Sequence, residues 1–140
     1  MCGITGIFNT KGKPVSQDVL QKMTDIVKHR GPDGEGIWLN DHVGFGHRRL
    51  SIIDLSEAGA QPMRNEDGNL TITYNGEVYN FKDIRHELRS KGYNFRSGTD
   101  TEVILKAFEE WGKDCVHKFN GMFAFAIWDN RKTQLFLARD

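Results

Sequence analysis

The chain has 140 residues, enough for one domain with a hydrophobic core and too few for two domains of ordinary size. Its 19 basic and 19 acidic residues cancel, so its charge gives no reason to expect a nucleic acid or an anionic membrane as a partner. The hydrophobic share of 38% excludes a disordered chain. No apolar run approaches the roughly 20 residues of a membrane helix, and no signal peptide is recognisable, so we expect a cytoplasmic protein.

Cysteines and histidines give no sign of a metal site. Cys2 and Cys115 are expected to stay as free thiols, because a chain without a secretion signal points to a reducing compartment. The histidines form no i, i+4 pair and flank no cysteine cluster; they stand at positions 29, 42, 47, 86 and 117. We therefore predict no metal and no cofactor in this domain.

The first six residues, 1–6, offer a nucleophile. Removal of Met1 by an aminopeptidase, which the small side chain of Cys2 permits, would leave a cysteine with both a thiol and a free α-amino group. Ordinary pKa values of about 8.5 for the thiol and about 7.7–8.0 for the amine let the amine accept the thiol proton without a histidine. The alternative is an ordinary first core strand in which Cys2 is an inert buried residue, and these residues alone leave both open.

A helix, a loop and a hairpin are predicted next. Ser16 can cap a helix whose apolar residues recur at helical spacing and which ends near residue 28 or 29. Residues 29–36 contain three glycines and a proline, which excludes regular structure. This segment is either a simple connection or a tight backbone around a small polar ligand. Strands over 36–39 and 43–47, joined by a turn at 40–41, form the hairpin.

Two arginines, Arg48 and Arg49, follow the hairpin and precede the apolar run 50–54. Only one of them is expected to point inward, where its guanidinium fork can bind a carboxylate through two parallel hydrogen bonds. A surface salt bridge is the alternative. Residues 55–68 show no periodicity, which is typical of a functional or mobile excursion.

An Asn-Gly pair, Asn75 and Gly76, follows a predicted half-buried strand over 70–74. Asn-Gly is a common hairpin turn, but the residues that follow predict a helix and not a second strand. We therefore interpret the Asn75 amide and the Gly76 N–H as two donors for a developing oxyanion.

Two helices follow this pair, the first over 81–90 with Asn80 as its cap and Gly92 as its stop. A short strand over 93–95 is expected between them. The second helix begins near Thr99 or Asp100, either of which can serve as its N-cap. A carboxylate at such a junction can also face a cleft, so the capping role and a ligand-binding role are compatible.

The last predicted elements are a short helix over 113–119 and two strands over 121–128 and 133–138. The first strand is apolar on both faces and is expected to lie buried between layers. The chain stops at Asp140 with no turn or cap to finish the last strand, so we expect the domain to be incomplete at its C-terminal end.

Six segments, in this order, closely resemble the glutaminase domain of glutamine-hydrolysing asparagine synthetases, which are class II glutamine amidotransferases. They are Met-Cys-Gly-Ile-Thr-Gly (1–6), His-Arg-Gly-Pro-Asp (29–33), Arg-Arg-Leu-Ser-Ile-Ile-Asp (48–54), Tyr-Asn-Gly-Glu-Val-Tyr-Asn (74–80), Gly-Thr-Asp-Thr-Glu-Val (98–103) and Asn-Gly-Met-Phe-Ala-Phe-Ala (120–126). The second and third segments resemble the asparagine-synthetase branch, as distinct from the sugar-phosphate and phosphoribosyl amidotransferases. The likeness covers residues 2–140.

The resemblance implies an α+β fold of the N-terminal-nucleophile (Ntn) hydrolase type. This is a four-layer αββα sandwich in which two mostly antiparallel sheets lie between helical layers. The glutaminase domain is expected over 2–140 and incomplete at its C-terminus, because the domain of the family continues past Asp140. The ATP-dependent synthetase domain of the family has no counterpart in these residues.

The resemblance also implies roles for individual residues. Cys2 would attack the side-chain amide of glutamine, its own α-amine serving first as base and then as the proton donor to ammonia. Asn75, through its side chain, and Gly76, through its N–H, would hold the oxyanion. The remaining predicted substrate-binding residues are Arg49 for the α-carboxylate, Glu77 and Asp100 for the ammonium group, and the backbone of Leu50, Ser51, Ile52 and Ile53.

The expected partners are L-glutamine, the synthetase domain of the parent chain and a second copy in a possible homodimer. In that parent, ammonia would convert aspartate to asparagine, and ATP and Mg²⁺ are expected only in the synthetase domain. Two alternatives stay open. One is a related biosynthetic amidotransferase with a different acceptor, and the other is a non-catalytic glutamine-binding fragment.

Overall fold

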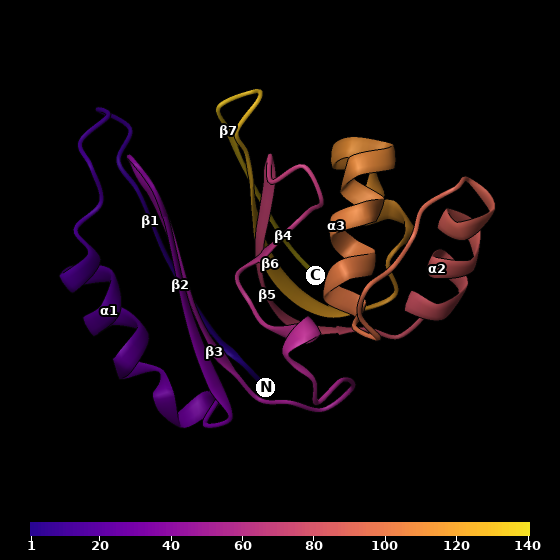
Figure 1. Cartoon of the computed structure of the whole chain (residues 1–140), viewed down its shortest axis with the longest axis horizontal. Coiled ribbons are helices and arrows are strands. Elements are labelled where there is room, and N and C mark those ends of the chain that lie inside the picture. The colour runs from indigo at the N-terminus through magenta and orange to yellow at the C-terminus, as the bar shows by residue number, and fades with distance from the viewer.

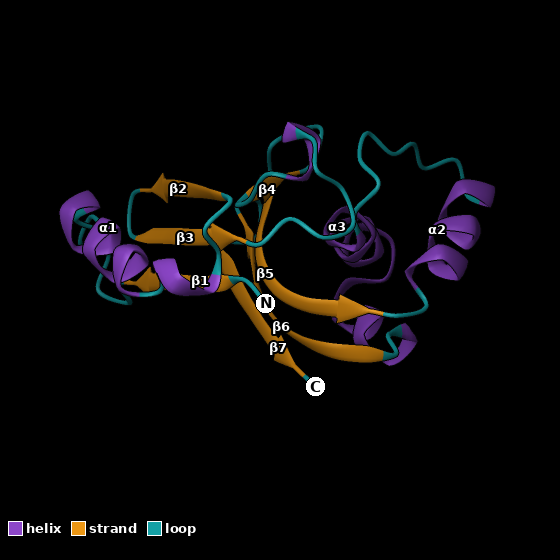
Figure 2. Ribbon diagram, turned by 90° about the horizontal axis from the view of Figure 1, so that it is seen from below, coloured by secondary structure: helices purple, strands orange, loops and turns teal.

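The computed structural model describes all residues from 1 to 140 and has four layers. Figure 1 shows α1 (Gln17–Ile26) on one side, then two sheets, then α2 (Phe81–Ser90) and α3 (Asp100–Trp111) on the other side. Figure 2 shows the strands of both sheets between these helical layers, with the N-terminus near the centre of the molecule. The predicted αββα sandwich is therefore confirmed.

The first sheet has three antiparallel strands in the order β1-β3-β2. They are β1 (Gly3–Phe8), β2 (Gly34–Asn40) and β3 (Val43–Arg49). Helix α1 covers one face of this sheet; Ser16 caps the helix as predicted, and its side chain accepts a hydrogen bond from Val19 N at 3.4 Å. Leu20 and Thr24 are buried under the helix, whereas Val19 and Ile26, expected on its apolar face, are exposed.

The second sheet has four antiparallel strands in the order β4-β5-β6-β7. They are β4 (Met63–Arg64), β5 (Leu70–Val78), β6 (Gly121–Asp129) and β7 (Gln134–Arg139). Strand β5 does not end at Tyr74 as predicted but continues to Val78, pairing Gly76 with Phe123 of β6. Only glycine fits at position 76, because φ is +144° and a Cβ there would lie 2.1 Å from Met122 O.

The main hydrophobic core lies between the second sheet and α2 and α3, and a smaller cluster lies between the two sheets. Strand β6 is buried on both faces from Phe125 onward, as predicted, and its residues contribute to both clusters, whereas Met122 near its start is exposed. Phe123, Phe125 and Ile127 belong to the main core, and Ala126 and Trp128 belong to the smaller cluster. None of the helices combines the length and apolarity needed to cross a lipid bilayer.

Several local predictions differ from the structure. Residues 29–36 are predicted to lack regular structure, but strand β2 begins at Gly34, because the segment pairs with the end of β3 and places Gly34 opposite Arg49. Residues 93–95 form no strand, and the hydroxyl of Tyr93 donates to Glu110 Oε2 at 3.0 Å. Asn80 stands at the N-cap of α2, but its side chain does not cap the helix. It donates to Lys118 O at 2.9 Å and accepts from Asn120 N at 3.0 Å, so it joins α2 to the segment before β6. Short 3₁₀ turns occupy Lys28–Arg30, Glu57–Gly59 and Gly112–Lys118, the last where a short helix is predicted.

Gly36 and Gly34 in β2 provide a matched test of packing between β2 and residue 61. A Cβ at Gly36 would lie 2.0 Å from Gln61 O, whereas one at Gly34 would lie 3.6 Å from Arg49 Cβ, an ordinary contact. We expect Gly36→Ala to lower the free energy of unfolding by about 1 to 3 kcal/mol, and Gly34→Ala to change it much less. Urea unfolding of both variants measures this, and equal stability of the two would contradict the close approach.

Candidate functional site

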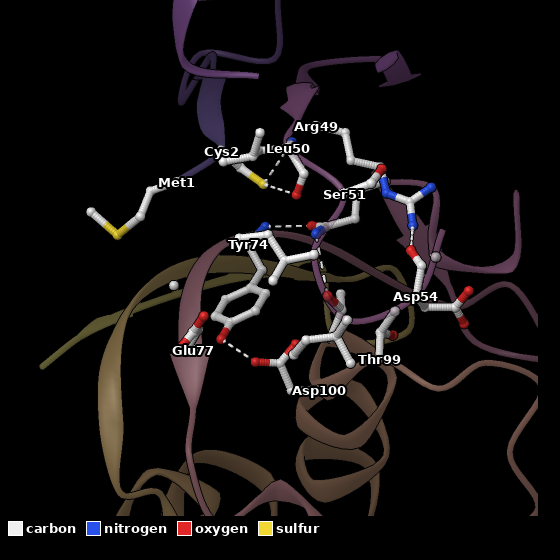
Figure 3. Close-up of a pocket in the computed structure, with 16 residues that line it drawn as sticks. Met1, Cys2, Arg49, Leu50, Ser51, Asp54, Tyr74, Glu77, Thr99 and Asp100 are labelled. Atoms are coloured by element: carbon white, nitrogen blue, oxygen red, sulfur yellow. Dashed lines mark hydrogen bonds between the residues drawn. The ribbon is translucent and has the colours of Figure 1, made fainter. Parts of the chain in front are cut away.

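A polar cavity of about 70 Å³ lies where the start of β1, the end of β3, strand β5 and the N-terminus of α3 meet (Figure 3). Nine of the ten predicted site residues line it, and Asn75 is the exception. The lining consists of Met1, Cys2, Arg49, Leu50, Ser51, Ile52, Ile53, Asp54, Gly59, Gln61, Tyr74, Gly76, Glu77, Thr99, Asp100 and Thr101. Residues that lie far apart in the sequence thus share one cavity.

Cys2 is held at the start of β1 by contacts to both its backbone and its thiol. Its Sγ accepts a hydrogen bond from Leu50 N at 3.3 Å, and the thiol donates weakly to Leu50 O at 3.7 Å. Arg30 Nε donates to Cys2 O at 3.0 Å. Met1 is largely exposed, and Figure 3 shows its side chain directed away from the sulfur. The thiol is therefore half-buried and fixed against the residue that follows β3.

The two arginines at the end of β3 point to opposite faces of the first sheet, as the alternation of a strand requires. Arg48 lies under α1, where it forms ion pairs with Asp25 and Glu35. Arg49 lines the cavity, donating to Ser56 O at 2.9 Å and to Asp54 O. Only Arg49 lines the cavity, but Arg48 is also directed inward, because it is buried between the sheet and α1, so the prediction that only one of the pair points inward is wrong. The guanidinium of Arg49 has further N–H groups beyond those that donate to Ser56 O and Asp54 O.

Asp54 connects the loop after β3 to the loop before α3. Its Oδ2 accepts from Gly98 N at 2.8 Å, and its Oδ1 accepts from Ser56 N at 2.8 Å and Ser56 Oγ at 2.6 Å. Hydrogen bonds from the Ser56 hydroxyl first, and from the Gly98 N–H next, lower the pKa of Asp54 to about 2. The carboxylate is therefore ionised at neutral pH and ties two walls of the cavity together.

The glycine-rich segment 29–36 supports the cavity from outside. Asp33 Oδ2 accepts from Ser51 N at 2.8 Å, and Asp33 N donates to Arg49 O at 2.9 Å. Gly31 allows the backbone of Arg48 to come close, since a Cβ at Gly31 would lie 2.2 Å from Arg48 O. No residue of this segment lines the cavity, and its contacts fix the Arg49–Ser51 backbone.

Asp100 is almost fully buried at the first turn of α3 and faces the cavity. Its Oδ2 accepts from the hydroxyl of Tyr74 at 2.7 Å and from Val78 N at 3.0 Å. Thr99 is the N-cap, and its side chain accepts from Glu102 N at 3.3 Å. Of the two N-cap candidates, Thr99 caps the helix and the neighbouring Asp100 faces the cavity.

The Asn75 and Gly76 pair is divided between two sides of β5. Gly76 lines the cavity, whereas Asn75 faces the first sheet, as does Thr73, whose hydroxyl donates to Gly46 O at 3.3 Å. Asn75 Oδ1 is buried without a hydrogen-bond partner. The amide of Asn75 thus lies beside the cavity and not in its lining, in contrast to the prediction.

Sequence reasoning missed Gln61 and Tyr74. Gln61 Oε1 accepts from Tyr74 N at 2.7 Å, and Gln61 Nε2 donates to Thr101 Oγ1 at 3.2 Å. Gln61 lies just before the two-residue strand β4, and its side chain accepts the hydrogen bond from the β5 backbone at Tyr74. The only signal was the unperiodic stretch 55–68, which indicated a functional segment without indicating which residue.

His47 holds Tyr74 from the first sheet. Its ring is fully buried, and Nε2 lies 3.1 Å from Tyr74 O, so the neutral tautomer carries its proton on Nε2. Burial lowers the pKa of His47 to about 4.

No three His, Cys, Asp or Glu side chains gather into a group that could hold a metal. The absence of a cofactor in this domain stays a prediction.

Two solved structures share this fold. The glutamine phosphoribosylpyrophosphate amidotransferase from B. subtilis, complexed with ADP and GMP, superposes with a TM-score of 0.77 at 19% identity, over 98% of this chain and 37% of that chain. A structure described as the allosteric regulatory enzyme of purine biosynthesis gives a TM-score of 0.79 at 20% identity with the same coverage. These two likenesses establish the fold class.

The sequence matches the family described as "Glutamine amidotransferase domain" over residues 1–140, and the chain belongs to that family. It is 47% identical to asparagine synthetase [glutamine-hydrolyzing] 3 of Bacillus subtilis, over 100% of this chain and 23% of the relative. It is 38% identical to asparagine synthetase B [glutamine-hydrolyzing] of Escherichia coli, with 25% of that protein covered, and 36% identical to amidase chry2 of Gibberella zeae, with 22% covered. The chain thus spans about a quarter of the length of these relatives.

His47 should make stability depend on pH. Its pKa in the folded protein, about 4, lies below the ordinary histidine value of 6.5, so the unfolded chain binds more protons between these two pH values. Wild-type stability should therefore fall as pH is lowered from 6.5 to 4, with a contribution from His47 of up to about 1.4 kcal/mol per pH unit.

Urea unfolding at several pH values measures this slope. His47→Gln, which can still donate to Tyr74 O, should lose that part of the slope, and the exposed control His86→Gln should keep it. A slope unchanged in His47→Gln would show that another group causes the acid sensitivity.

Proposed function

We propose that the chain hydrolyses glutamine to glutamate and ammonia, with Cys2 as the nucleophile once Met1 is removed. The single observation that carries this proposal is that the Cys2 sulfur, the Arg49 guanidinium and the Asp100 carboxylate line one small polar cavity. Membership of the glutamine amidotransferase family supports the same conclusion.

The chemistry requires a thiolate and a proton carrier. The α-amine of the mature N-terminus takes the Cys2 proton, and the sulfur adds to the amide carbon of glutamine. The C–N bond then breaks, the protonated amine gives its proton to the departing ammonia, and a thioester remains. Water hydrolyses the thioester to glutamate and restores the thiol. His47 takes no part, because it is neutral, buried and absent from the cavity lining.

The oxyanion of the tetrahedral intermediate needs hydrogen-bond donors. Gly76 lies at the cavity, where its N–H can donate to the oxyanion, and the amide of Asn75, the preceding residue of β5, lies beside the cavity. The unpaired buried oxygen of Asn75 indicates an amide that is not committed to another partner. We propose that its NH₂ group donates to the oxyanion when substrate is bound.

Recognition of free glutamine needs opposite charges at two ends of the cavity. We propose that Arg49 binds the α-carboxylate and that Asp100 and Glu77 bind the α-ammonium group, while the backbone of residues 50–53 lines the space between them. The contacts of Arg49 to Asp54 O and Ser56 O support this assignment, because they hold the guanidinium at the cavity with further N–H groups to offer.

We further propose that the ammonia serves a synthetase domain in a longer parent protein. The names of the relatives and the quarter of their length that this chain spans support a parent that amidates aspartate to asparagine. ATP and Mg²⁺ would then act in that domain only. The parent protein would be cytoplasmic and could form a homodimer. The likeness to amidase chry2 supports a second candidate, a parent with a different ammonia acceptor.

Cys2→Ala should abolish glutamate release, because no other thiol lines the cavity. The control Cys115→Ala should keep turnover, since burial raises the pKa of the Cys115 thiol to about 12 and leaves it unreactive. Coupled glutamate detection measures activity, and intact-mass analysis should find Met1 removed. Full activity with Met1 retained would contradict the mechanism, and glutamine binding without turnover would favour a binding module.

Asn75→Ala should lower kcat by about 10²- to 10³-fold, the usual loss when one oxyanion donor is removed. Because the side chain meets the transition state and not the ground state, KM should change little. The exposed Asn130 in the turn after β6 provides the control, and Asn130→Ala should keep the wild-type rate. A kcat within a few fold of wild type in Asn75→Ala would remove Asn75 from the oxyanion site.

A further inference from the structure

We propose that Tyr74 is a positioning residue that gives the site its preference for an α-amino group, by holding Asp100 so that one carboxylate oxygen faces the substrate. The proposal rests on the proposed function, because it concerns the end of the cavity where the ammonium group of glutamine would bind. Tyr74 would not contact the amine of the substrate and would act on it only by orienting Asp100.

The two oxygens of Asp100 have different surroundings. Oδ2 accepts two hydrogen bonds, from the Tyr74 hydroxyl at 2.7 Å and from Val78 N at 3.0 Å, whereas Oδ1 accepts none from the protein. Figure 3 shows the Tyr74 hydroxyl, which lies beside Glu77, pointing at one carboxylate oxygen of Asp100. A buried carboxylate with one saturated oxygen and one open oxygen presents a directed acceptor for a cation.

The phenol of Tyr74 cannot turn away from Asp100, because the residue is fixed at several points. Gln61 accepts from its backbone N–H at 2.7 Å, His47 donates to its carbonyl at 3.1 Å, and its ring belongs to the main core. Burial, reinforced by the negative charge of Asp100, raises the pKa of Tyr74. The hydroxyl is therefore protonated and serves as a donor throughout the physiological range.

Val78 N alone would hold Oδ2 through a single bond and leave the carboxylate free to rotate. With the phenol in place, rotation would break two hydrogen bonds in a buried site, which is costly. The open oxygen is thus aimed before substrate arrives. This preorganisation should strengthen the binding only of a ligand that carries an amine. The contacts of the carboxylate and amide groups of the same ligand should not depend on it.

The test compares two ligands in Tyr74→Phe, which keeps the ring and removes only the hydroxyl. Glutamine carries the α-amine, and glutaramate has the same chain without it. We expect KM for glutamine to rise about tenfold, as for the loss of one hydrogen bond to a charged group, with kcat nearly unchanged. The affinity for glutaramate, measured as Kd by calorimetry in a Cys2→Ala background, should not change.

Tyr79→Phe is the matched control, because Tyr79 is exposed and makes no hydrogen bond through its hydroxyl. Asp100→Asn should raise KM for glutamine at least as much as Tyr74→Phe, and adding Tyr74→Phe to it should change KM by less than about twofold. If circular dichroism shows that Tyr74→Phe does not fold, Asp100→Asn alone must still lower the affinity for glutamine and leave the affinity for glutaramate unchanged.

The outcomes separate this proposal from the proposed function. If the wild-type chain neither binds nor hydrolyses glutamine, the proposed function fails and the role of Tyr74 fails with it. If the wild type is active but Tyr74→Phe lowers the affinity for both ligands equally, or changes the affinity for neither, only the role of Tyr74 is overturned. A loss specific to glutamine supports it, because a merely structural defect would not distinguish the two ligands.

Discussion

The site depends on the hydrogen bonds around Tyr74. Its carbonyl is bonded to His47 of the first sheet, its N–H to Gln61, and its hydroxyl to Asp100 at the start of α3. All of these groups are buried, so breaking any one contact would leave a polar atom without a partner inside the protein. One residue of β5 thereby joins three of the four layers at the edge of the cavity.

Cys2, the proposed nucleophile, is fixed to this frame through the first sheet. Strand β1 pairs with β3 in a register that places Gly3 opposite Arg48, and the Cys2 thiol meets the backbone of Leu50. The first sheet is in turn held to the second by the bond from His47 to Tyr74 O. The position of the sulfur relative to Asp100 is therefore set by packing of the two sheets, and not by flexible loops alone.

The sequence predicted the parts of the site that follow from local rules. Strand alternation explains why only Arg49 faces the cavity, and helix capping placed Thr99 and Asp100 at the start of α3. The roles of Gln61 and Tyr74 arise from contacts between residues far apart in sequence, which no local periodicity contains. Residues 93–95 failed as a strand for a related reason, because their apolar side chains pack against helices without any strand partner.

The spacing of the two charged ends of the cavity is also fixed by polar contacts through Asp54. The carbonyl of Asp54 accepts from Arg49, and the carboxylate of Asp54 accepts from Gly98 N, two residues before Asp100. A movement of the guanidinium is therefore transmitted through one residue to the loop that carries Asp100. Because Asp54 is ionised at neutral pH, this link is a charge-assisted hydrogen bond. The separation between the Arg49 guanidinium and the Asp100 carboxylate is thereby set by contacts within the protein and does not depend on a bound ligand.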